Sequence, residues 1–198
     1  MITLLFAILT FALIVKLNEI IGFRVGFRIE RENLSNPNRE GSEIKEVSGE
    51  EKILKTIRSG YLNFDPESFL KKAEKVFEMV FKSYADGDKS TLKDLLSPRT
   101  FKAFSMAIDE RKKQGETLEG SILQFAETEL VDATTRDDTL YVTVRFVTDQ
   151  TTVLRSADGV ILEGNPDYVE SRTDVWVFSR KINSSDPRWF LHEIKSED

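Results

Sequence analysis

The hydrophobic period of the chain changes near Gly120, and this change limits the fold more than any other sequence feature. Before it, apolar residues recur at helical spacing, as in the run from Phe69 to Tyr84. After it, apolar and polar residues alternate with a period of two, most clearly from Leu140 to Val147. Helices followed by consecutive strands are typical of an α+β domain, in which helices pack on one curved antiparallel sheet.

Cap and turn residues divide the two halves into elements. A helix start is indicated where Asp65 precedes Pro66, and another where Ser97 precedes Pro98. Glycine follows each of these apolar runs, which is typical of a helix end. We therefore expect helices over residues 66–86, 88–96 and 98–114. The alternating segments predict a sheet of about four strands, over residues 121–134, 140–147, 169–180 and 189–194.

Residues 1–21 predict a transmembrane anchor. The run MITLLFAILTFALIV carries no charged side chain, and Leu17, Ile20 and Ile21 extend it if Lys16 reaches the interface. A spanning helix needs ~20 apolar residues. A signal peptide would need a preceding basic stretch and a following small-residue cleavage site, and a helix buried in a domain core is the other alternative. Lys and Arg follow the run, so the positive-inside rule predicts one span with the amino terminus outside and the remainder in the cytoplasm.

Residues 22–49 predict a flexible tether. From Glu30 to Gly49 the sequence is polar and rich in Asn, Ser and Glu, with Pro37 and Gly41. A segment of this composition buries too little apolar surface to order itself. The sequence therefore predicts an anchor and a tether, followed by an amphipathic segment over residues 50–63 and a domain over residues 64–198.

Residues 50–63 contain a short amphipathic helix with two alternative roles. Its apolar side chains fall on one face and its basic side chains toward the other. Beside an anchor, such a helix can lie on a lipid surface; alternatively, its apolar face docks on its own domain. The candidate membrane-contact residues are Lys52, Ile53, Leu54, Lys55, Ile57 and Arg58.

Composition excludes several classes of function. The chain has no cysteine, so it has no disulfide, thiolate metal site or cysteine nucleophile. His192 is the single histidine, and it cannot build a multi-histidine metal centre. The net charge of -6 argues against nucleic acid as a partner, because phosphate binding needs a dense basic surface. We expect no cofactor, no metal and no nucleic-acid partner.

Catalytic patterns are weak in this chain. His192 lies in the last expected strand, where a lone histidine is usually structural. Glu127 and Glu129 share a strand face. They are either a carboxylate pair of the kind that enzymes use or part of a solvated surface. Arg172 and Asp174 share a face of another strand, either as cross-strand ion-pair partners or as the rim of a pocket. These patterns favour a non-catalytic domain.

An ordered series of short motifs resembles the Tim44-like family, including its bacterial members. The series covers the chain from about Phe64 to its last residue. Its pieces are Phe64-Asp65, Phe69-Leu70, Gly87-Asp88 with Leu92, Leu95-Leu96-Ser97-Pro98, Gly115-Glu116-Thr117, Val142-Thr143-Val144-Arg145-Phe146-Val147, Asp158-Gly159, Gly164-Asn165-Pro166, Thr173-Asp174-Val175-Trp176-Val177-Phe178 and Asp186-Pro187-Arg188-Trp189. The sequence departs from many members at Lys71-Lys72, where those members carry small residues.

The resemblance implies a fold and a function for residues 64–198. The fold is cone-like and similar to the nuclear-transport-factor-two-like proteins. The function is a membrane adaptor related to the mitochondrial import-motor anchor, which recruits a protein partner such as a chaperone or translocase component to the cytoplasmic face of a bacterial inner membrane. The long chaperone-binding region of the mitochondrial proteins has no counterpart in this sequence, so import-motor function does not carry over as a whole.

Two alternatives of other classes accompany the resemblance. A small-ligand or lipid-binding protein, or an enzyme, would use an apolar pocket under the sheet, although core packing would use the same residues. The candidate pocket residues are Phe77, Phe81, Phe101, Phe104, Phe125, Phe146 and Trp176. A ribosome-docking protein would use a basic patch formed by Lys71, Lys72, Lys75, Lys102, Lys112 and Lys113.

Overall fold

The computed structural model describes residues 49–61 and 63–195. The expected anchor, residues 1–21, and the tether up to residue 48 lie outside the described residues and stay predictions. Among the residues that are described, no helix is both long and apolar enough to cross a membrane.

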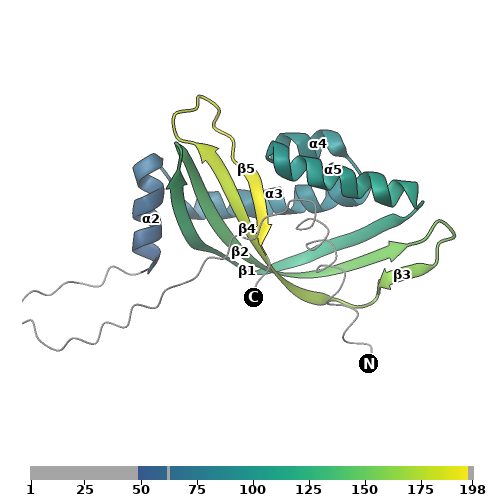
Figure 1. Ribbon diagram of the computed structural model, residues 1–198. Coiled ribbons are helices and arrows are strands. Elements are labelled where there is room, and N and C mark those ends of the chain that lie inside the picture. The colour runs from purple at the N-terminus through teal and green to yellow at the C-terminus, as the bar shows by residue number, and fades with distance from the viewer. Residues whose placement is uncertain (1–48, 62, 196–198) are drawn as a thin grey trace, which may run out of the picture.

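The described residues form four helices followed by a sheet (Figure 1). The helices are α2 (Gly49–Gly60), α3 (Pro66–Asp86), α4 (Lys89–Leu95) and α5 (Pro98–Lys113). Asp88 caps α4 by accepting hydrogen bonds from two backbone N–H groups, and the Ser97 hydroxyl caps α5. Asp65 precedes α3 without a side-chain cap bond, and Gly87 ends it in the left-handed conformation.

Five antiparallel strands make up the sheet, one more than the alternation predicts. They are β1 (Thr117–Arg136), β2 (Thr139–Arg155), β3 (Ile161–Gly164), β4 (Glu170–Lys181) and β5 (Phe190–Lys195). The order is β1-β2-β4-β5, and β3 pairs with the far end of β2. The prediction missed β3 because four residues are too few to establish a period. The expected α+β class with an antiparallel sheet is confirmed.

Helices α3, α4 and α5 gather over one face of the curved sheet, and α2 stands beside β1 (Figure 1). The core lies between α3 and this face. Phe77 of α3 stacks on Trp176 of β4 with ring centroids 4.3 Å apart, and its ring lies 5.0 Å from that of Phe146 on β2. All three side chains are buried. Their burial fixes the position of α3 across the middle strands.

Arg111 ties the end of α5 to the end of α3. Its Nη2 donates hydrogen bonds to the backbone carbonyl oxygens of Tyr84 and Ala85, at 2.6 and 2.8 Å. Its guanidinium also lies 4.8 Å from the centre of the Tyr84 ring, an attractive cation–π geometry. A buried charge is costly unless it is paired, and these carbonyls at the helix end supply partial negative charge. The contact therefore joins α3 and α5, the two longest of the described helices.

Candidate functional site

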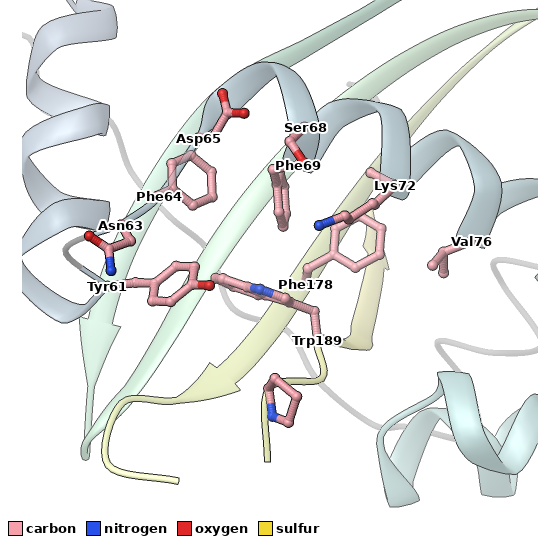
Figure 2. A pocket seen from close by; sticks show the side chains of 12 residues that line it. Tyr61, Asn63, Phe64, Asp65, Ser68, Phe69, Lys72, Val76, Phe178 and Trp189 are labelled. Carbon is pink, nitrogen blue, oxygen red and sulfur yellow. The ribbon is translucent and has the colours of Figure 1, made fainter. Parts of the chain in front are cut away.

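A groove opens beside the first turns of α3 and has a volume of about 240 Å³. Residues from four separate parts of the chain line it: the connection between α2 and α3, the start of α3, strand β4, and the segment that leads into β5. Figure 2 shows these side chains converging from the helix and the sheet. The lining residues are Tyr61, Asn63, Phe64, Asp65, Ser68, Phe69, Lys72, Ala73, Val76, Phe178, Pro187 and Trp189.

Aromatic rings hold the groove in shape. The Phe69 ring lies 5.1 Å from that of Phe64, 5.0 Å from that of Trp189 and 5.9 Å from that of Phe178. These are tilted or edge-on contacts, which the quadrupoles of aromatic rings favour. At the other end, the Arg180 guanidinium lies 4.3 Å from the centre of the Tyr61 ring. The groove is thus a preformed surface and does not depend on a ligand to assemble it.

The groove suits an apolar side chain of a protein partner. Phe64 and Phe69 are buried, while Tyr61 and Trp189 keep part of their rings exposed. Asp65 and Lys72 are exposed at its rim, one acidic and one basic. Aromatic floors with a polar rim are typical of protein interfaces, in which large rings supply contact area and the rim supplies orientation. The arrangement of an aromatic floor and a polar rim favours binding.

The seven candidate pocket residues lie elsewhere, in or beside the core. None of them lines the groove. Phe77, Phe125, Phe146 and Trp176 come together in one aromatic cluster, with Phe125 5.6 Å from Phe77. Phe104 is buried against Tyr84, 5.3 Å between ring centroids. The other two, Phe81 and Phe101, are partly buried.

The amphipathic helix docks on its own domain, the second of the two arrangements left open by its sequence. Ile57 has no exposed surface, and Ile53 and Leu54 pack against the core cluster. Ile57 is therefore unavailable to a lipid surface in this arrangement. The three basic residues, Lys52, Lys55 and Arg58, are exposed.

Charge reversal on α2 tests the membrane contact that these exposed basic residues could make. In a fragment beginning at Ser48, we expect the triple change of Lys52, Lys55 and Arg58 to Glu to abolish flotation with anionic vesicles at low salt. Each basic residue near an anionic surface contributes about 1 kcal/mol, so losing three weakens binding on the order of 100-fold. Vesicles of zwitterionic lipid are the control. Flotation that persists after charge reversal contradicts a contact through this face.

Local contacts account for Glu127, Glu129 and His192, the residues with weak catalytic patterns. Arg145 pairs with Glu127 at 2.8 Å and with Glu129 at 3.4 Å, so these carboxylates belong to a cross-strand ion pair. The His192 ring packs edge-on against Tyr141, 5.0 Å between centroids. Burial lowers the pKa of His192 and favours the neutral imidazole.

Arg172 and Asp174 lie on the face of β4 that packs against the helices, as the sequence alternation indicates. The Nε of Arg172 is 3.9 Å from a carboxylate oxygen of Glu170. Burial raises the pKa of the Asp174 carboxyl, and the nearby Arg172 opposes that shift. The pocket-rim role given to these two residues stays a prediction.

Fold and groove together define a class of protein: an α+β domain that presents an aromatic groove beside α3. The model of one protein family, the Tim44-like domain, matches residues 50–196. The chain belongs to this family, as the ordered motifs indicate.

The chain is similar to two curated proteins. The chain is 22% identical over 150 residues to the probable mitochondrial import inner membrane translocase subunit tin-44 of Caenorhabditis elegans, a match that covers 74% of this chain and 35% of that protein. It is 25% identical over 136 residues to the human mitochondrial import inner membrane translocase subunit TIM44, covering 67% of this chain and 30% of that protein. The chain thus matches about a third of the length of these relatives.

A solved structure with a similar chain trace is the intermembrane space region of the chloroplast protein ARC6. It shares 16% sequence identity, with a TM-score of 0.42, and the match covers 64% of this chain and 94% of that one.

Proposed function

We propose that this protein is an adaptor that holds a protein partner at the inner face of a membrane, next to a protein translocase. The observation that carries the proposal is the Tim44-like domain over residues 50–196, because both curated relatives are named as inner-membrane translocase subunits. The preformed aromatic groove supports it, since a scaffold needs a surface that is ready to bind.

The proposal assigns a role to each part of the chain. Residues 1–21 anchor the protein in the membrane with the amino terminus outside, and residues 22–49 let the domain reach its partner from a fixed point. Tethering raises the local concentration of the domain at the membrane, so weak contacts suffice there. The groove takes an apolar side chain of the partner, which is a chaperone or a translocase component. The domain has no catalytic role in this account.

Site-specific crosslinking in the native cell tests this assignment. A photoreactive amino acid at Ser68, inside the groove, is expected to capture a membrane translocase subunit or a chaperone. The matched control places the same group at Asp158, an exposed position in the turn before β3. We expect the control to miss that partner. Identical adducts from both positions, or adducts from Ser68 that include no membrane protein or chaperone, contradict the proposal.

A further inference from the structure

The walls and the size of the groove limit the kind of segment that it can bind. An added β-strand needs a free strand edge. Phe178, the β4 residue in the lining, is already paired with Val142 of β2 on one side and with Leu191 of β5 on the other. An amphipathic helix needs room for anchors at positions i, i+3, i+4 and i+7. The groove's volume of about 240 Å³ is too small for such a row, so a short extended segment fits it better.

Two aromatic rings in the groove are held in place and keep exposed surface. The Arg180 guanidinium lies 4.3 Å from the centre of the Tyr61 ring, and the Phe69 ring lies 5.0 Å from that of Trp189. Tyr61 and Trp189 both line the groove and are partly exposed (Figure 2). Proline-rich segments dock on aromatic-lined grooves of this kind, and a proline side chain has no rotamer freedom to lose on binding.

Hydrogen-bond donors accompany the rings. The Tyr61 hydroxyl, the Asn63 amide and the Trp189 indole N–H belong to lining residues that keep exposed surface. A segment in the polyproline II conformation has no internal backbone hydrogen bonds, so its carbonyl oxygens can accept from such donors. The carbonyls of an α-helix are already paired within the helix. The donors therefore favour a polyproline II segment over a helix.

Two opposite charges stand on the rim of the groove. Asp65 directly precedes α3, and its exposed carboxylate makes no cap hydrogen bond to the helix. Lys72 is exposed in the second turn of α3. Seven residues of helical rise separate the two by about 10 Å along the helix, the length of about three polyproline II residues. The rim thus complements a short segment with a basic residue near one end and an acidic residue near the other.

We propose that the groove binds a proline-containing segment of the partner protein in the polyproline II conformation. The prolines pack on Tyr61 and Trp189, and the neighbouring donors bind backbone carbonyls of the segment. A basic residue of the segment lies beside Asp65, and an acidic residue lies beside Lys72. This inference rests on the proposed function, because the groove is the surface through which the adaptor holds its partner.

Selection from a peptide library tests the class of segment. Short random peptides displayed on phage are first depleted on the folded Trp189→Ser protein and then selected on the full chain. We expect the recovered peptides to be enriched in proline, with a basic residue on one side of the prolines and an acidic residue on the other. Recovery of peptides without proline enrichment, or of no peptide specific for the unaltered chain, overturns the proposal.

Titration of the best recovered peptide measures the contribution of proline. Its version with every proline changed to alanine is the matched probe. We expect the proline peptide to bind the full chain at least about tenfold more tightly, because it is preorganised and its rings fill the groove. Tyr168→Ser lies outside the groove and should leave this affinity unchanged. Equal binding of the two peptides overturns the proposal.

Asp65→Asn tests the charge contact at an exposed position whose change should not disturb folding. We expect it to weaken the recovered peptide about twofold to fivefold, the usual range for an exposed ion pair. It should have no effect on a peptide whose basic residue is changed to glutamine. An equal effect of Asp65→Asn on both peptides overturns the placement of the basic residue.

The crosslinks from Ser68 separate a failure of this inference from a failure of the adaptor role. A translocase or chaperone component captured there through a segment without proline overturns the inference and leaves the adaptor role intact. Tight binding of the proline peptide, with no such component captured at Ser68, supports the inference and contradicts the adaptor role.

Discussion

Replacing Phe77 by Ala is expected to destabilise the domain by about 3–5 kcal/mol, the usual cost of removing a buried aromatic side chain. Phe77 is 3% exposed, and its ring contacts those of Phe125, Phe146 and Trp176, which come from three different strands. No other described side chain has ring contacts with all of these three strands. The truncation therefore leaves a cavity where α3 crosses the sheet, and domains of this kind have a total stability of only about 5–15 kcal/mol.

Thermal unfolding of the full chain measures this effect. At about 2–4 °C per kcal/mol, Phe77→Ala should lower the Tm by roughly 6–20 °C. Met79→Ala is the control on the same helix: Met79 is 46% exposed, and surface changes usually stay within about 0.5 kcal/mol. If both variants unfold within a degree or two of each other, α3 does not pack on the sheet through Phe77.

The strongest periodic patterns predicted the fold well. The run from Phe69 to Tyr84 predicted α3, because its apolar face is needed to cover the sheet. The alternation from Leu140 predicted β2, although the strand continues to Arg155. Its continuation carries polar residues on the core face, such as Thr148 and Gln150, and the simple alternation of apolar and polar residues fades there. Strand pairing with β1 and β4, which a single sequence does not reveal, keeps it extended.

The docked position of α2 could not be derived from its sequence. An amphipathic pattern tells which residues share a face, but a bilayer and a protein surface offer that face the same apolar environment. In the structure, Ile57 is fully buried and α2 packs beside β1. Whether α2 docks on the domain or on a bilayer depends on the shape of the surface that β1 presents. That surface exists only once the sheet is formed.

The groove was also beyond sequence reasoning. Tyr61 and Phe69 lie far from Trp189 in the sequence. They meet because β5 returns beside β4 and brings Trp189 against the first turn of α3. Each residue alone has the properties of an ordinary core aromatic. The candidate pocket residues predicted from the sequence are therefore aromatic residues in or beside the core, and Phe69 and Trp189 are not among them.

A second large effect is expected from the groove itself. Trp189 is partly exposed there and its ring lies 5.0 Å from that of Phe69, so it offers an aromatic contact to a partner. Tryptophan residues in such positions often carry about 2 kcal/mol or more of binding free energy. Since about 1.4 kcal/mol is a factor of ten in affinity, Trp189→Ser should weaken partner binding at least about tenfold. Tyr168→Ser is the control, because Tyr168 is an aromatic residue that is 64% exposed and lies outside the groove.

Co-isolation from native membranes measures the adaptor role most directly. The full chain, Trp189→Ser and Tyr168→Ser are each purified from membranes at equal amounts of folded protein, as judged by their thermal unfolding. The translocase or chaperone components that accompany each are then quantified. The adaptor account predicts that the partner recovered with the unaltered chain falls at least about tenfold in Trp189→Ser and stays unchanged in Tyr168→Ser. Equal recovery with Trp189→Ser, or recovery of no translocase or chaperone component with the unaltered chain, would contradict it.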